Sequence, residues 1–114
     1  MLIIKDNIRI HELREMSKKM FGDLVKAVVD IEKEIMAVDG ELHADEEQLL
    51  LANGSSQANL WGINIYPDMV GGDDFVEFDS MINIRPSIGN RSRGVEDPEV
   101  RERILNVVDN LITK

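Results

Sequence analysis

The feature that most constrains the fold is an amphipathic helix predicted at the end of the chain, in the stretch VEDPEVRERILNVVDNLI at 95–112. Asp97 is a typical N-cap residue, Pro98 suits a first helical turn because its missing N–H would have no partner there, and Glu99 favours the positive end of the helix dipole. One face is apolar and consists of Val100, Ile104, Val107, Val108 and Leu111. A stripe of this kind is stable only when another layer buries it, so the upstream segments have to form that layer.

Those upstream segments predict mostly strands. We expect strands at 2–4 (LII), 61–67 (WGINIYP) and 75–85 (FVEFDSMINIR), and helices at 10–21 and, capped by Asp45, from 45 to about 52. The stretch LVKAVVDIEKEIMAV at 24–38 fits either a helix or a strand pair. Because it is rich in β-branched residues, we predict two strands, 24–31 and 34–42, that turn at Glu32–Lys33.

The predicted order is therefore β-α-β-β-α-β-β-α. At 114 residues, with 43% hydrophobic and 31% charged residues, the chain is expected to form one α+β domain over 1–114. The architecture that we predict is a mostly antiparallel sheet with its helices on one face. The first six elements match the order of a ferredoxin-like fold, to which the last strand and helix would be added.

The charge of the chain is strongly acidic and unevenly distributed. The net charge is −9, and residues 30–80 hold thirteen acids against one base, Lys33. Such a surface disfavours long duplex nucleic acid and anionic membranes, because both need a basic contact surface. There is no cysteine, no apolar run long enough for a membrane span and no cofactor signature, so we expect a cytoplasmic protein without a cofactor.

A loop at 85–94, RPSIGNRSRG, is the exception to this acidity, and we call it the arginine loop. It carries Arg85, Arg91 and Arg93 and no acid. Guanidinium groups suit carboxylate or phosphate, and Ser87 and Asn90 add further donors, so the sequence predicts an anion site here. We expect Arg85 to pair with nearby acids of its own strand, and Arg91 and Arg93 to face outward. A polar sheet face next to the loop would consist of Asn64, Tyr66, Glu77, Asp79, Asn83 and Arg85.

A metal site is the alternative that the sequence offers. Glu41, His43 and Asp45 alternate in the stretch ELHAD, so an extended strand would place all three on one side. An imidazole with two carboxylates can hold zinc or a harder divalent ion. This pattern would fit a small metal-dependent hydrolase, although Asp45 also has an explanation as a helix cap.

Four strings in the chain resemble a known family. They are VKAVVDIEKEIMAV, ELHADEEQLLL, NLWGINIYP and FDSMINIRPSIGNRSRGVEDPEVR, and together they span nearly the whole chain. The chain is similar to a family of small bacterial and archaeal single-domain proteins that is known only as a domain of unknown function. The resemblance implies a free-standing domain and brings no activity, cofactor or site residue.

The residues themselves therefore carry the functional prediction. The first hypothesis is a non-catalytic binding or interaction domain that uses the arginine loop and the polar sheet face. Its partner would be an anionic small molecule or an acidic protein surface. The small metal-dependent hydrolase is the second hypothesis. The third is a purely structural homodimer that pairs through an open sheet edge.

Overall fold

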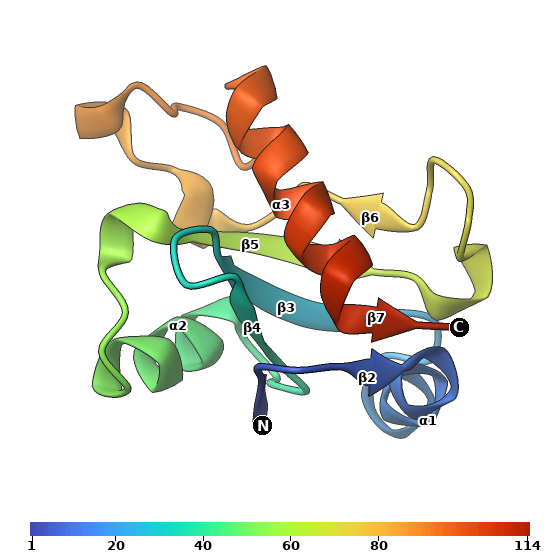
Figure 1. The fold of residues 1–114 in the computed structure, drawn as a ribbon. Helices are drawn as coiled ribbons and strands as arrows, with labels where there is room; N and C mark the ends of the chain where they lie inside the picture. Colours follow the sequence, from blue (N-terminus) through green and yellow to red (C-terminus); the bar gives the residue numbers. More distant parts are fainter.

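A computed structural model describes all residues 1–114, and its centre is a five-stranded sheet in the order β1-β4-β3-β5-β6 (Figure 1). Its strands are β1 (Leu2–Ile4), β3 (Val25–Asp30), β4 (Ile35–Val38), β5 (Leu60–Ile65) and β6 (Val76–Glu77). Three helices accompany it, α1 (Ile10–Met20), α2 (His43–Ala52) and α3 (Pro98–Leu111). Every neighbouring pair in the sheet is antiparallel, which confirms the predicted α+β class. A short parallel pair of β2 (Ile8–Arg9) and β7 (Ile112–Thr113) was not predicted.

The ambiguous stretch 24–38 is a strand pair, as predicted. β3 and β4 are antiparallel with Val28 opposite Ala37. The turn between them contains neither glycine nor asparagine. It is stabilised instead by the side chain of Asp30. Its Oδ1 accepts hydrogen bonds from the amides of Glu32 and Lys33, both at 2.9 Å, and Glu34 takes the positive φ of 57° that the turn requires.

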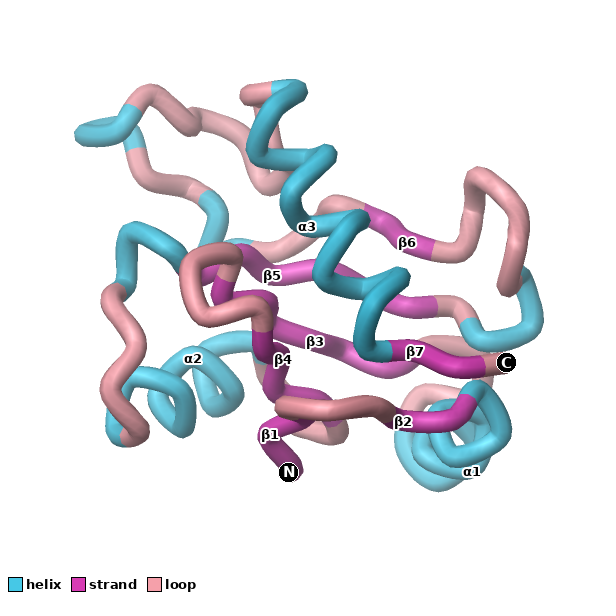
Figure 2. Tube along the Cα trace, viewed as in Figure 1, coloured by secondary structure: helices cyan, strands magenta, loops and turns pink.

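Helices cover both faces of the sheet, so the prediction of helices on one face is wrong. A large core cluster packs α1 and α3 on one face, with Leu13 and Ile104 fully buried. A smaller cluster packs Leu50 of α2 against Val28 and Ala37 on the opposite face. In Figures 1 and 2, α3 crosses in front of the sheet and the fainter α2 lies behind it.

The topology explains why α1 and α2 lie on opposite faces. The connection from β1 to β3 contains α1 and skips β4, and the connection from β4 to β5 contains α2 and skips β3. Both connections move in the same direction across the sheet, but β1 and β4 run antiparallel. Crossovers of the same, right-handed sense then place their helices on opposite faces.

This topology also corrects the ferredoxin-like prediction. The first three sheet strands, β1, β3 and β4, lie in the order expected for a split βαβ unit, with β4 in the middle. In a ferredoxin-like sheet the fourth strand would pair with β1. Here β5 pairs with β3 instead, and β1 remains at the edge.

The predicted strand 75–85 is mostly wrong. Only Val76 and Glu77 pair with β5, and two 3₁₀ turns follow at Met81–Asn83 and Pro86–Ile88. Beyond β6, the side chain of Asn83 takes the place of a strand. Its Oδ1 accepts from the amide of Gly62 at 2.8 Å and its Nδ2 donates to the Gly62 carbonyl at 2.9 Å. The alternating apolar residues of this segment therefore predicted a strand, but most of the segment does not form one.

The start of α2 differs as well. Asp45 was predicted as its cap, but the helix begins at His43, and Leu42 occupies the N-cap position without a side-chain hydrogen bond. Two acids of this helix, Glu46 and Glu47, are buried, so its inward face is more polar than the sequence pattern suggested. None of the helices is long and apolar enough to cross a membrane.

The last helix is as predicted. Asp97 accepts a hydrogen bond from the amide of Glu99 at 2.9 Å, and the stripe residues Ile104, Val107, Val108 and Leu111 are buried against the sheet.

We expect Ile104→Ala to lower the free energy of unfolding by about 2–5 kcal/mol, because it empties a fully buried site. Urea unfolding measures this loss, and exposed Leu105→Ala on the same helix is the control. A loss below about 1 kcal/mol would show that this helix face is not packed as described.

Candidate functional site

The three arginines of the arginine loop lie in three different environments. Arg85 points inward, where its guanidinium donates to the carbonyls of Gln57 and Leu60, both at 2.6 Å, and lies 4.2 Å from the centre of the Trp61 ring. Burial lowers the pKa of Arg85. The prediction that Arg85 pairs with acids of its own strand is wrong. Because 81–85 is not a strand, Arg85 reaches the start of β5 and binds main-chain carbonyls.

Asn90 holds the arginine loop together through its side-chain amide. Its Nδ2 donates to the carbonyls of Asn83, Ser92 and Gly94, and its Oδ1 accepts from the amide of Glu96. The predicted ligand residue Asn90 is therefore engaged with its own loop and is buried. The other uncharged candidate, Ser87, lies exposed on the outside of the loop.

Arg91 and Arg93 differ from each other. Arg91 is exposed and its side chain forms no ion pair, whereas its backbone amide and that of Ser92 donate to Glu96. These two bonds lower the pKa of Glu96. Arg93 does not lie free as expected, because its Nε donates to Asp79 Oδ1 at 2.6 Å. The terminal nitrogens of Arg93 form no hydrogen bond or ion pair within the chain.

The predicted metal ligands do not converge. Glu41 and Asp45 are exposed, whereas His43 is buried and its Nε2 lies 2.8 Å from the Ile63 carbonyl. The alternation that would have aligned them requires a strand, but residues 43–45 form the first turn of α2. No group of three or more histidine, cysteine, aspartate or glutamate side chains is arranged to hold a metal ion.

His43 instead lies in a pocket of about 220 Å³ between the first turn of α2, strands β3 and β5 and the arginine loop. We call it the His43 pocket. It joins the three features that the sequence suggested separately, because it contains His43, residues of the polar sheet face and Arg93. Its ten lining residues are Lys26, Leu42, His43, Ala44, Asn64, Asp79, Ser80, Met81, Ile82 and Arg93.

Burial determines the charge of His43. It lowers the pKa of the imidazole, and the nearby charge of Lys26 acts in the same direction. The hydrogen bond to the Ile63 carbonyl, the charge of Asp79 and the neighbouring side-chain amide of Asn64 act in the opposite direction without cancelling the effect of burial. His43 is therefore neutral at pH 7, with the proton on Nε2, where it donates to Ile63.

The amide of Asn64 forms another wall of the pocket. Its Nδ2 donates to Glu77 at 2.8 Å and to the Asp79 carbonyl at 3.4 Å. Its Oδ1 is buried and has no hydrogen-bond partner in the chain. Such an unsatisfied buried acceptor is uncommon in folded proteins. Asn64, Tyr66, Glu77 and Asp79 thus do form the predicted polar sheet face, whereas Asn83 and Arg85 turn away from it.

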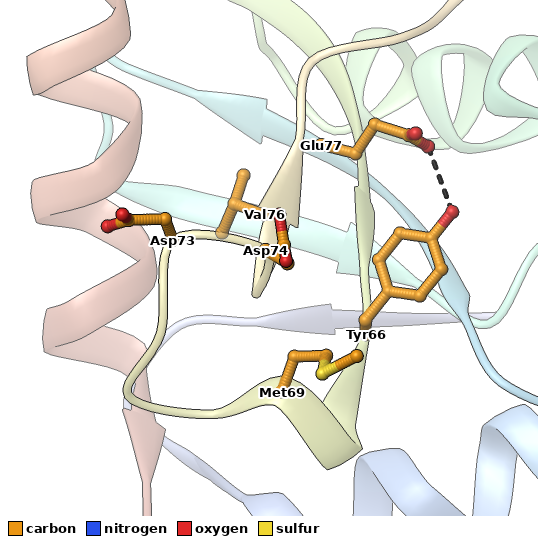
Figure 3. Close-up of a pocket in the computed structure, with 6 residues that line it drawn as sticks. All are labelled: Tyr66, Met69, Asp73, Asp74, Val76 and Glu77. Carbon is orange, nitrogen blue, oxygen red and sulfur yellow. Dashed lines mark hydrogen bonds between the residues drawn. The ribbon is translucent and has the colours of Figure 1, made fainter.

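A second pocket, of about 340 Å³, lies on the other side of Glu77 and is shown in Figure 3. The Tyr66 hydroxyl donates to Glu77 at 3.0 Å, and Asp73 and Asp74 lie on the adjacent loop. Burial, followed by the contact with Glu77, raises the pKa of Tyr66. The polar groups here are carboxylates and one phenol, so this pocket lacks a positive charge.

Comparison with known proteins gives one match. The model of the family described as "Protein of unknown function (DUF5674)" matches residues 2–111, which is nearly the whole chain. No curated protein and no solved structure matches.

A buried acid on α2 makes stability depend on pH. Glu46 is fully buried, its Oε2 accepts from the amide of Gly40 at 2.9 Å, and burial raises its pKa from 4.5 to about 9. Folding therefore takes up a proton between these two values, and stability falls as the pH rises through this window. Glu46→Gln removes this dependence. At each pH we compare the free energy of unfolding of the variant with that of the unchanged protein. This difference should shift in favour of the variant by about 1–3 kcal/mol from pH 5.5 to pH 8.

Urea unfolding at the two pH values measures that difference, and exposed Glu41→Gln is the control that should show almost none. An equal effect of Glu46→Gln at both pH values would mean that Glu46 is ionised in the folded protein.

Arg85 should stabilise the arginine loop. Arg85→Lys keeps the charge but cannot reach both carbonyls and cannot stack as a plane on Trp61, so we expect a loss of about 1–3 kcal/mol. Trp61 is the only tryptophan in the chain, so its fluorescence reports unfolding. The matched Arg91→Lys should stay within about 0.5 kcal/mol of the unchanged protein. Equal stability of the two variants would contradict an anchoring role for Arg85.

Proposed function

We propose that this chain, which belongs to the DUF5674 family, is a binding domain for a small anionic molecule that enters the His43 pocket. The observation that carries the proposal is the meeting of two positive side chains, Lys26 and Arg93, in one small cavity of a chain with a net charge of −9.

Lys26 and Arg93 support anion binding because both keep hydrogen-bond donors that no group of the chain occupies. Lys26 forms no ion pair, and its Nζ lies 4.8 Å from the centre of the Phe21 ring. Arg93 uses only its Nε for Asp79, which orients the guanidinium while its terminal nitrogens stay available. A fixed, planar guanidinium loses little freedom when it binds a planar or tetrahedral anion.

The rest of the pocket supports a small molecule as the ligand. A volume of about 220 Å³ lies below the usual range for drug-sized ligands. Positive charge is confined to two side chains, so a long polyanion would find no continuous basic surface around the pocket. The metal-dependent hydrolase loses its basis, because Glu41, His43 and Asp45 do not meet.

Thermal unfolding in the presence of phosphate, sulfate and acetate tests this proposal. We expect at least one of them to raise the melting temperature in a concentration-dependent way, because a ligand that binds only the folded state stabilises it. Lys26→Met and Arg93→Gln should each weaken that effect about tenfold or more. Arg91→Gln, an exposed arginine of the same loop that does not line the pocket, is the matched control.

Two results would contradict the proposal. If none of the anions shifts the melting temperature at about 50 mM, the pocket is not an anion site. If Arg91→Gln abolishes the shift while Lys26→Met and Arg93→Gln preserve it, anions bind on the outer side of the arginine loop instead.

A further inference from the structure

The polar atoms of the His43 pocket define its ligand more narrowly. We propose that the ligand is a small monocarboxylate with a short apolar chain; this inference rests on the function proposed above. It follows from the charge of the pocket, from the number of its free hydrogen-bond donors and from its apolar wall.

The charge of the pocket matches one negative charge. Its lining contains two positive groups, Lys26 and Arg93, and one negative group, Asp79, while His43 is neutral. The carboxylate of Glu77 also lies beside the pocket, because it binds the side chain of Asn64. A monoanion therefore balances the net charge of the lining, whereas a dianion would be repelled by these carboxylates.

Few donors remain free in the pocket. The Asn64 Nδ2 donates to Glu77 and Asp79, and the His43 Nε2 lies against the Ile63 carbonyl. Ser80 accepts from the amide of Ile82 at 3.3 Å, so only its hydroxyl proton is available. The remaining donors are Lys26, the terminal nitrogens of Arg93, the Ser80 hydroxyl and the first-turn amides of α2, which no side chain caps. They suit the two oxygens of a carboxylate, whereas a phosphate or sulfate adds negative charge that the two positive groups and Asp79 do not balance.

The apolar chain of the ligand would contact the apolar residues that line the pocket. Four lining residues are apolar, Leu42, Ala44, Met81 and Ile82. Leu42 is 55% and Met81 is 65% exposed, so a ligand chain that covers them removes apolar surface from water. A volume of about 220 Å³ gives room for a carboxylate with a few carbon atoms.

Isothermal titration with four matched compounds tests the ligand class. Compared with butyrate, acetate has a shorter chain, butyramide has no charge, and propylphosphonate has a tetrahedral anion that can carry a second charge. We expect butyrate to bind about tenfold more tightly than acetate, because two more methylene groups are buried. Butyramide should not bind, and propylphosphonate should bind at least about tenfold more weakly than butyrate.

Two methionines give matched variants for the apolar wall. Met81→Ser should remove most of the preference for butyrate over acetate. Met69→Ser, which changes a methionine of similar exposure in the second pocket, should preserve it. An acetylated dipeptide that ends in a free leucine carboxylate, with its C-terminal amide as control, distinguishes a polypeptide terminus from a free acid as the source of the same chemistry.

The outcomes separate this inference from the proposed function. If sulfate or phosphate binds through Lys26 and Arg93 but butyrate binds no better than acetate, the monocarboxylate inference is wrong and the anion site stands. If propylphosphonate binds more tightly than butyrate, the carboxylate preference is wrong. If no anion binds at all, both proposals are overturned.

Discussion

The pairing of the Asn83 side chain with the backbone of Gly62 is the interaction that holds the arginine loop against the sheet. β6 pairs with β5 only through Val76 and Glu77, so the rest of the β5 edge needs another partner. Asn83 supplies it with an acceptor and a donor to Gly62, and the same Nδ2 also donates to the Arg93 carbonyl at 2.9 Å. Position 62 has to be glycine, because a Cβ there would lie 2.5 Å from Ser80. One amide thus closes the sheet edge and fixes the arginine loop beside it.

The arginine loop is ordered by side chains instead of by regular secondary structure. Asn90 binds three carbonyls and one amide, Glu96 accepts from two amides, and Arg85 binds two carbonyls. These bonds are local or reach directly to β5, so the loop has a defined path without a strand or a helix. A defined path matters because Arg93 can meet Lys26 and His43 only if the backbone at 91–94 is held in place. The residues that looked like ligands, Arg85 and Asn90, therefore support the one that reaches the pocket.

The sequence predicted the parts of the fold that a local signal specifies. The cap and stripe of α3, the strand pair in 24–38 and the strand near 60–65 follow from propensity and periodicity. The burial of Glu46 and Glu47 could not be read from periodicity, which assigns acids to the surface, and so the inward face of α2 was missed. Asn83 could not be recognised as a substitute strand, because its partner is twenty-one residues away. The sequence suggested the His43 pocket only in pieces, because its residues come from five separate segments of the chain.

The unsatisfied polar atoms of the structure gather beside these same segments. Glu46 Oε1 and Asn64 Oδ1 lie buried and unpaired on the α2 face of the sheet, and Trp61 Nε1 and Arg85 Nε lie under the arginine loop. Each such atom lowers stability relative to a paired or apolar replacement. The large core between the sheet, α1 and α3 contains one of them, the indole nitrogen of Trp61, at its border with the loop. Two of the four atoms lie on the α2 side, and the other two lie on the opposite side, where Arg85 stacks on Trp61. Unsatisfied atoms therefore do not by themselves mark one face as a binding side. The proposal of a site on the α2 side rests instead on Lys26 and Arg93, which both line the His43 pocket.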